Sequence, residues 1–155
     1  MPQVYRQAAV IPYRVREERV EIALVTSRDG KRWVVPKGSL DDGEDAMDAA
    51  VRETEEEAGL LGELVEQPIG WYRYTKQNER YHVVVYLMRV TVVLESWMEA
   101  ESRHRCFMSV EDALMQLHPG LHEFVHEAAR LVRAQGSWSV EGSGRALPRR
   151  TAYAP

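Results

Sequence analysis

The segment at residues 44–59 constrains the fold more than any other part of this chain. Its apolar or small side chains recur at i, i+4, i+7 and i+11, which is the spacing of one face of an amphipathic helix. The positions on this stripe are Met47, Val51, Thr54 and Ala58. Gly59 follows the stripe, and glycine often ends a helix because it adopts the left-handed conformation without strain. The sequence therefore predicts a helix that ends at Gly59 and packs through this stripe.

The densest group of acidic residues lies on and just before this helix. Residues 41–57 carry nine acidic side chains and one basic residue, Arg52, so their formal charge is −8 in a chain of formal charge −4. The acids are Asp41, Asp42, Glu44, Asp45, Asp48, Glu53, Glu55, Glu56 and Glu57. The remainder of the chain is therefore mildly basic, at +4. Such a cluster is either a solvated helix face or a cation site beside groups that bind an anionic substrate.

Three of these carboxylates share one face of the predicted helix. Glu53, Glu56 and Glu57 fall within about 100° of one another beside the apolar stripe. Like charges at this spacing destabilise an isolated helix, so we expect something to neutralise them. Small side chains on or next to the same face are expected to leave room for a ligand, and they belong to Ala46, Ala49 and Ala50. Oxygen ligands of this kind suit Mg²⁺ or Mn²⁺.

Length and composition fit one globular domain. The chain has 155 residues, of which 45% are hydrophobic and 28% charged, which excludes a disordered chain, a collagen-like fibre and a two-domain enzyme. We expect the domain to cover residues 1–135. A tail at residues 136–155, rich in Gly, Ser, Arg and Pro, is expected either to be flexible or to pair with a second subunit of a homodimer.

The sequence also predicts where the protein resides. A lone cysteine, Cys106, forms no intramolecular disulfide and cannot supply the paired cysteines of common zinc signatures. No segment approaches the roughly 18 apolar residues of a membrane span, and the N-terminal residues lack an apolar signal region. We therefore expect a cytoplasmic protein with no membrane partner. Nucleic acid is an unlikely partner, because basic residues gather only in the tail, at Arg145, Arg149 and Arg150.

The remaining pattern predicts an α/β fold. Apolar, β-branched runs indicate strands at residues 7–15, 20–26, 32–35, 63–75 and 80–95. A loop is expected at residues 37–43 and another at residues 96–105. Ser109 followed by acidic residues resembles a helix N-cap, so helices are expected at residues 110–117 and 121–134. Strands on both sides of one central helix indicate an α/β sandwich with a mixed sheet.

The polar and glycine positions around the central helix resemble the Nudix box. That pattern is Gly-x5-Glu-x7-Arg-Glu-U-x-Glu-Glu-x-Gly-U, where U is a bulky apolar residue, and here it runs from Gly38 to Leu60. All fixed polar and glycine positions match, and the one departure is Thr54 at the first U position. The resemblance implies a Nudix-type α/β/α sandwich and a hydrolase of nucleoside diphosphates linked to another group.

The resemblance also implies roles for individual residues. Glu53, Glu56 and Glu57 would bind Mg²⁺ or Mn²⁺, and Glu53 would orient or deprotonate the attacking water. Gly38 would offer its backbone carbonyl to the metal, and Arg52 would pair with a neighbouring carboxylate.

Many Nudix proteins take a further carboxylate from the loop after the long strand. This chain offers three acids there, and we favour the second as an additional metal ligand: they are Glu95, Glu99 and Glu101.

A substrate with many phosphates needs cations near the metal. Guanidinium groups bind phosphate in a bidentate manner, whereas a lysine acts as a point charge. The candidates are Arg6, Arg28, Arg32, Lys37, Arg80, Arg103 and Arg105. Tyrosines on the later strands could stack on an adenine, although core positions are more common for strand aromatics: they are Tyr72, Tyr74 and Tyr81. The histidines are expected to be structural, at His82, His118, His122 and His126.

Beyond the box, residues 5–132 are similar to the diphosphoinositol polyphosphate and diadenosine polyphosphate hydrolases. The carriers include Arg32 to Pro36, Glu95-Ser96-Trp97 and Arg103 to Phe107; the departures are Pro36 to Ser39 and Cys106. This similarity implies a Mg²⁺-dependent pyrophosphohydrolase acting on one of these two substrate classes. Two alternatives stay open: a hydrolase of nucleoside triphosphates or of the 5′-triphosphate of RNA, and a nucleotide-binding regulator without turnover.

Overall fold

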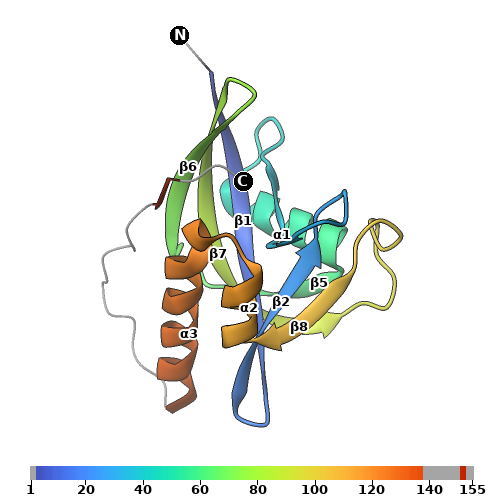
Figure 1. Cartoon of the computed structure of the whole chain (residues 1–155), viewed down its shortest axis with the longest axis vertical. Helices are drawn as coiled ribbons and strands as arrows, with labels where there is room; N and C mark the ends of the chain where they lie inside the picture. Colours follow the sequence, from blue (N-terminus) through green and yellow to red (C-terminus); the bar gives the residue numbers. More distant parts are fainter. Residues whose placement is uncertain (1–2, 138–150, 153–155) are drawn as a thin grey trace.

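A mixed β-sheet with helices on both faces organises the chain (Figure 1). The computed structural model describes residues 3–137 and 151–152. The strands are β1 (Val4–Arg16), β2 (Arg19–Thr26), β3 (Trp33–Val34), β4 (Lys37–Ser39), β5 (Leu60–Leu64), β6 (Gly70–Lys76), β7 (Glu79–Val93), β8 (Arg105–Ser109) and β9 (Thr151–Ala152). The helices are α1 (Ala46–Ala58), α2 (Val110–Gln116), the 3-10 turn η1 (Pro119–Leu121) and α3 (His122–Ser137).

Strand β1 lies at the centre of the sheet. It runs parallel to β7 from the pair Val4↔Arg80 to the pair Tyr13↔Arg89. Its other edge is shared, because β2 pairs only with residues 13–16 and β4 pairs with residues 7–9. Strand β2 then diverges from β1 and pairs with β3 on that edge, while its opposite edge pairs with β8. The divergence opens the sheet edge on which the residues before α1 are bound.

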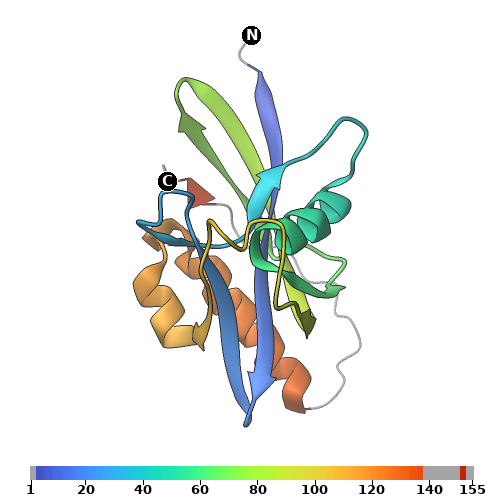
Figure 2. The ribbon, with the colours of Figure 1, turned by 90° about the vertical axis from the view of Figure 1, so that its right-hand side faces the viewer.

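The alternation of side chains along β1 separates two hydrophobic layers. Ala9, Ile11 and Tyr13 belong to a core with α2 and α3, whereas Ala8 and Val10 pack against α1. Figure 2 shows α1 on one side of the sheet and α2 with α3 on the other. The expected α/β/α sandwich with a mixed sheet is confirmed.

Two tight turns join the long strands. Glu17 and Glu18 connect β1 to β2 with φ of 51° and 64°, and Gln77 and Asn78 connect β6 to β7 with the same values. Positive φ at both central residues is typical of the turn whose twist matches a two-residue hairpin. Both turns lie between strands that the sequence predicts, in the gaps at residues 16–19 and 76–79.

Three strand predictions were wrong. The expected loop at residues 37–43 begins with β4, which lies against β1 because β2 has left that edge. The expected long strand at residues 63–75 is two strands, β5 and β6, separated by a bend before Pro68. Strand β8 was not expected, because its five residues have no clear alternation and are held by pairing with β2.

Helix α1 has the boundaries that its capping residues indicate. The Asp45 side chain accepts a hydrogen bond from the backbone N–H of Asp48, and Gly59 has a φ of 63° and donates its N–H to the carbonyl of Glu55. Thr54 is fully buried, and its hydroxyl donates to the carbonyl of Ala50 at 2.7 Å. Threonine at this position, where the sequence pattern has a bulky apolar residue, is therefore accommodated within the helix.

The packing face of α1 differs from the expected one. Ala49, Ala50 and Ala58 are 0% exposed, whereas Val51 is 37% exposed. Ala49 and Ala50 pack against the sheet at Ala8 and Val10, so their small size brings the helix close to β1, while Ala58 packs with Ala23 and Val25 of β2. The expectation that they leave room for a ligand was wrong.

The tail expected at residues 136–155 lies mostly outside the described residues. Residues 136–137 continue α3, and Thr151–Ala152 pair in parallel with Tyr72 and Arg73 of β6. Among the helices within the described ranges, none is long and apolar enough to cross a membrane.

We expect Gly59→Ala to destabilise the fold more than Gly43→Ala. Both glycines have positive φ, at 63° and 78°, so each substitution introduces backbone strain of about 1 kcal/mol. At Gly59 the new Cβ would also lie 2.7 Å from the Trp97 ring, whereas at Gly43 it would meet nothing within 4 Å. Urea unfolding would measure both variants, and equal losses of unfolding free energy would contradict the tight approach of Trp97.

Candidate active site

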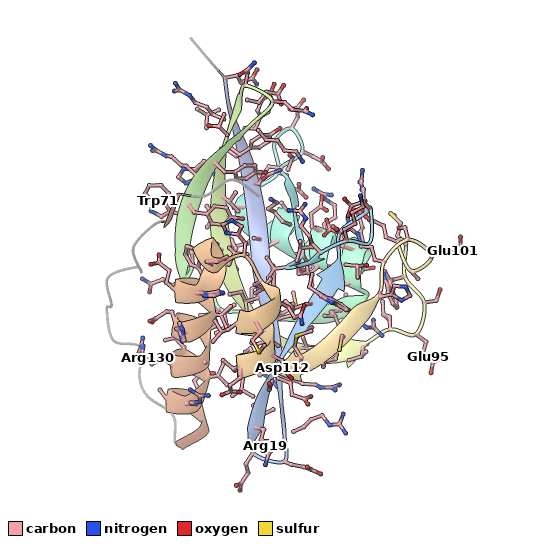
Figure 3. The ribbon with its side chains drawn as sticks, viewed as in Figure 1. Arg19, Trp71, Glu95, Glu101, Asp112 and Arg130 are labelled. Carbon is pink, nitrogen blue, oxygen red and sulfur yellow. The ribbon has the colours of Figure 1, made fainter. Side chains whose placement is uncertain are left out.

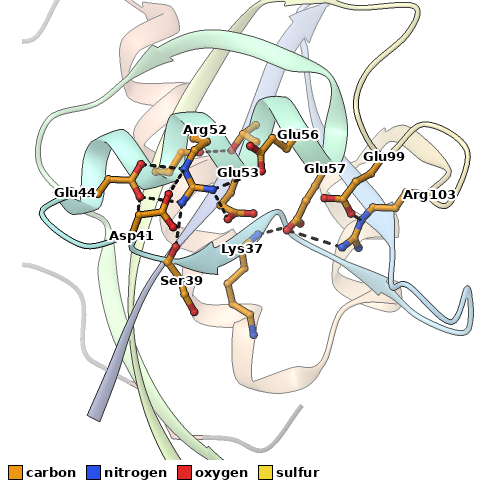
Figure 4. Close-up of polar contacts among 12 residues, drawn as sticks. Lys37, Ser39, Asp41, Glu44, Arg52, Glu53, Glu56, Glu57, Glu99 and Arg103 are labelled. Carbon is orange, nitrogen blue, oxygen red and sulfur yellow. Dashed lines mark hydrogen bonds and ion pairs between the residues drawn. The ribbon is translucent and has the colours of Figure 1, made fainter. Parts of the chain in front are cut away.

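The guanidinium of Arg52 joins the loop before α1 to the carboxylates on the helix (Figure 4). Its Nε and Nη2 donate to the two carboxylate oxygens of Glu44 at 2.9 and 2.8 Å. Its Nη1 donates to Glu53 at 2.8 Å and to Glu56 at 3.5 Å, and its Nη2 also reaches the carbonyl of Ser39 at 3.0 Å. Arg52 therefore fixes the position of β4 relative to the carboxylate face of α1.

Gly38 lies directly against Glu53. A Cβ at residue 38 would overlap the Glu53 carboxylate, so only glycine permits this approach. Pairing of Gly38 with Ala8 holds the backbone there. The glycine of the box is thus required by the contact between β4 and α1.

Glu57 is the most buried of the three helix carboxylates. Its side chain is 8% exposed, accepts a hydrogen bond from the backbone N–H of Lys37 at 3.2 Å and lies 3.9 Å from Arg103. Burial raises the pKa of Glu57 to about 8, although Arg103 and the Lys37 N–H oppose the rise and Glu53 adds to it. A buried carboxylate beside a second carboxylate favours a bound cation, because the cation would offset both the cost of burying the charge and the repulsion between the two carboxylates.

The segment at residues 94–105 closes the C-terminal end of α1. The N–H of Glu99 donates to the carbonyl of Glu56 at 3.0 Å, and the Trp97 indole donates to the carbonyl of Glu57 at 2.9 Å. Arg105 donates to the carbonyl of Ala58 at 2.8 Å and lies over the Trp97 ring. The last carbonyls of a helix lack partners within it, and this segment supplies them, so it fixes the turn that carries Glu57.

Arg103 links Glu57 to Glu99. Its Nε donates to Glu99 at 2.8 Å, its Nη1 donates to the carbonyl of Thr26 at 2.9 Å, and its side chain is only 7% exposed. Glu99 is therefore brought to the same side of the helix as Glu57 (Figure 4). This places the additional carboxylate near the site, while its role as a metal ligand stays a prediction.

A cleft of about 560 Å³ opens beside Glu57. One part of its wall is apolar or aromatic, with Trp33, Tyr72, Tyr74, Leu117 and Leu121, and another is cationic, with Arg28, Arg32, Lys37, Lys76 and Arg103. The cleft lies between the β3–β4 segment, β6 and the α2–η1 turn. Its lining can therefore contact both phosphates and a flat apolar group.

Four of the seven expected phosphate-binding residues line this cleft: Arg28, Arg32, Lys37 and Arg103. The other three do not line it. Arg105 caps α1 as described above, and Arg6 and Arg80 lie on β1 and β7 with their side chains on the α1 side of the sheet. The sequence alone did not reveal on which face of the sheet each of these side chains lies.

Lys37 is held inside the cleft by aromatic contacts. Its Nζ donates to the Tyr74 hydroxyl at 3.2 Å and lies 4.4 Å from the centre of the Tyr74 ring. The Tyr74 hydroxyl in turn donates to Gln7 at 2.6 Å, and its ring stacks on Tyr81 at 4.7 Å. Burial lowers the pKa of Lys37 to about 8, although Glu57 opposes this shift.

Two of the expected tyrosines belong to the core and also form part of the cleft wall. Tyr72 is fully buried and contacts Phe124, while Tyr74 is 8% exposed; both contribute to the cleft wall. His118 caps the η1 turn through the N–H of Gly120 at 2.9 Å, and His82 stacks on Trp71, so both have structural contacts.

Comparisons with known proteins agree with this arrangement. Residues 4–128 match the family model described as "NUDIX domain". The chain belongs to the Nudix family. It is 34% identical to Nudix hydrolase 4 of Arabidopsis thaliana over 70% of the chain, a match that spans 58% of that relative's length. It is also 34% identical to human diphosphoinositol polyphosphate phosphohydrolase 3-beta, over 81% of the chain and 78% of that protein.

Solved structures of other proteins show the same fold. The Ap4A hydrolase of C. elegans in a binary complex superposes with a TM-score of 0.74 at 21% identity, covering 84% of this chain and 98% of the other. A Nudix family hydrolase from Clostridium perfringens superposes with a TM-score of 0.66 at 19% identity, covering 84% and 97%.

Members of the Nudix family generally use a divalent metal such as Mg²⁺. Within the described part of this Nudix protein, no three acidic, histidine or cysteine side chains are arranged to hold an ion as they stand. Two of the three helix carboxylates, Glu53 and Glu56, are instead paired with Arg52. The donor set nevertheless fits Mg²⁺ in chemistry, because Glu53 and the buried Glu57 are neighbouring oxygen donors beside a glycine backbone that no Cβ covers.

Several residues of the cleft were not expected from the sequence. Trp33, Lys76, Gln116 and His118 come from four different segments and meet only in the folded chain. Lys76 is the last residue of β6, next to the turn at Gln77 and Asn78, and this place in the sequence does not by itself indicate a binding residue. Arg52 was expected to pair with a neighbouring carboxylate, but its simultaneous contact with Ser39 requires the position of β4.

We expect Glu44→Gln to flatten the dependence of stability on pH in acid. Hydrogen bonds from Arg52 and from the Asp41 backbone lower the pKa of Glu44 from 4.5 to about 2. A lowered carboxyl pKa stabilises the folded state above pH 4.5, and this contribution is lost as the pH falls from 4.5 through about 2. The unfolding free energy, measured with urea at a series of pH values, should therefore fall less steeply in Glu44→Gln than in the wild type.

Glu66→Gln is the matched control, because Glu66 is exposed between β5 and β6, away from Arg52. Equal slopes for Glu44→Gln and the wild type would contradict the role of the Arg52 pair.

Proposed function

We propose that this Nudix protein is a cytoplasmic, Mg²⁺-dependent pyrophosphohydrolase that cleaves a phosphoanhydride bond in a diadenosine polyphosphate or a diphosphoinositol polyphosphate. The observation that carries this proposal is the position of the buried Glu57 at a cleft lined by Arg28, Arg32, Lys37 and Arg103. A carboxylate that would hold a cation and a set of cations that would hold phosphates thus face the same space.

The proposed metal ligands are Glu53, Glu56 and Glu57, with the backbone of Gly38 and the side chain of Glu99 as further candidates. When bound, the ion would neutralise charge on diphosphate oxygens and lower the pKa of a water molecule. Glu53 would orient or deprotonate the attacking water. Arg52 holds Glu53 at 2.8 Å and so limits the positions that this carboxylate can adopt.

The cationic residues of the cleft would bind and orient the phosphates. Arg28 and Arg32 are exposed at its rim, where their guanidinium groups can approach a phosphate from solvent. Lys37 is held by Tyr74 next to Glu57, which suits contact with the phosphate group nearest the metal ligands. Fixing the diphosphate in this way would align it for attack by water.

The two substrate classes differ in what the cleft must accommodate. Several relatives with 32–35% identity have names that refer to diphosphoinositol polyphosphates, and the cationic wall suits that class. The aromatic and apolar wall formed by Trp33, Tyr74 and Leu117 suits the adenine of a diadenosine polyphosphate. A diphosphoinositol polyphosphate has no such ring. The cleft therefore supports both classes, and the leaving group must be identified from products.

A substrate panel tests the proposal and its alternatives. Diadenosine polyphosphates, diphosphoinositol polyphosphates, nucleoside triphosphates and 5′-triphosphate RNA would be incubated with the full chain and Mg²⁺, and the products would be identified by chromatography. Cleavage of either of the first two classes is expected. Pyrophosphate release from only the last two would establish the triphosphatase alternative, and binding without turnover of any compound would establish the regulator.

We expect Glu53→Gln to lower kcat by about 10²-fold or more, because loss of a base or metal ligand removes stabilisation made only in the transition state. Glu55→Gln is the matched control: Glu55 is on the same helix but exposed, and its kcat should stay within about twofold of the wild type. Turnover on the best substrate of the panel would be measured with Mg²⁺ and with Mg²⁺ removed. Equal kcat for the wild type and Glu53→Gln would refute the catalytic assignment.

A further inference from the structure

Part of the sheet on the α1 side is not covered by the helix. Helix α1 packs on the part of the sheet that contains Ala8, Val10 and Tyr86. Figure 2 shows β1, β6 and β7 continuing beyond the helix, next to the loop that precedes α1. The residues of this region are Val4, Arg6, Trp71, Arg73, Arg80 and His82, and we refer to them as the basic sheet face.

The register of three strands brings these residues together. Arg6 pairs with His82 across β1 and β7, and Arg73 pairs with His82 across β6 and β7, so the three form one row. The Trp71 ring stacks on His82 at 4.7 Å, and the Arg73 guanidinium lies 5.1 Å from the Trp71 ring centre. Figure 3 shows Trp71 directed outward at the β6 edge of the sheet.

The arginines of the basic sheet face carry charge without an acidic partner. Arg6, Arg73 and Arg80 are exposed, and none of them forms an ion pair with any residue in the described ranges. Val4 beside them is 51% exposed. The face therefore combines apolar surface with unpaired positive charge, outside the cleft and away from the carboxylates of α1.

An acidic surface of the same chain adjoins this face. The backbone N–H of Leu40 donates to the carbonyl of Arg6 at 3.1 Å, so the loop before α1 begins beside the basic sheet face. On the loop and first turn, Asp42 and Asp48 are exposed and form no ion pair with the described residues.

We propose that this face is the interface of a homodimer, in which the basic sheet face of one copy contacts the acidic loop, residues 41–48, of a second copy. A two-fold axis between the basic and acidic surfaces would form each contact twice, because such an interface is self-complementary. Val4 is on β1, the strand nearest the acidic loop, and would lie near the axis. A polyanion such as RNA is disfavoured as the occupant, since Asp42 and Asp48 would repel it at the edge of the same face.

The first test is the oligomeric state of the full chain as a function of salt. Sedimentation equilibrium at low ionic strength should show a reversible dimer, and the dissociation constant should increase as salt screens the charges. A monomer at every concentration up to about 100 μM, the range of weak interfaces, would overturn the proposal. A dimer whose dissociation constant is indifferent to salt would overturn it too.

Charge reversal gives the sharper test. Arg73→Glu/Arg80→Glu should raise the dissociation constant at least about tenfold, and so should Asp42→Lys/Asp48→Lys. The control Arg16→Glu/Arg19→Glu has the same change in net charge as the first variant but lies at the opposite end of β1, and it should dimerise like the wild type (Figure 3).

Mixing the two interface variants should restore a heterodimer, because each reversed surface then meets a complementary one. Circular dichroism would establish that each variant is folded. If the variants dimerise like the wild type, or if mixing restores nothing, the interface is elsewhere; binding of single-stranded RNA to a monomer through Arg73 would assign the face to a polyanion instead.

Discussion

The contacts of the Arg52 guanidinium are the constraint on which the site depends. One planar cation holds both oxygens of Glu44, the carbonyl of Ser39 and the carboxylate of Glu53. It thereby offsets part of the repulsion among the acids of α1 and ties the helix to β4. Because β4 is bound to β1, the carboxylate face of the helix has a fixed position relative to the sheet. The cleft beside Glu57 follows from this geometry.

The central helix and the grouping of its glutamates could be predicted from the sequence because their signals are local. Gly59 and the spacing of the glutamates are read within a few turns of one helix. The packing face could not be predicted in this way: Val51 was expected inside and is exposed, because the close approach of α1 to β1 favours Ala49 and Ala50. Long-range pairing likewise decided β4 and β8, whose short segments carry little strand signal of their own.

The same distinction applies to the cations. Arg28, Arg32, Lys37 and Arg103 line the cleft as expected, whereas Arg6 and Arg80 lie on the other side of the sheet and Arg105 closes the end of α1. The register of a strand decides on which face of the sheet each of its residues lies. The positions of charged residues in the sequence do not reveal that register. The basic residues outside residues 41–57 therefore lie on two surfaces, one beside Glu57 and one beside the acidic loop.

The most direct test of the account is the position of a divalent ion in a crystal of the full chain soaked in Mn²⁺, located by anomalous scattering. The account predicts a strong peak bound by Glu53 and Glu57 next to Gly38, at the mouth of the cleft, with the contacts of Arg52 rearranged to release the carboxylates. A peak only among the exposed acids of residues 41–48, or no bound ion while Arg52 and Arg103 keep their present partners, would contradict it.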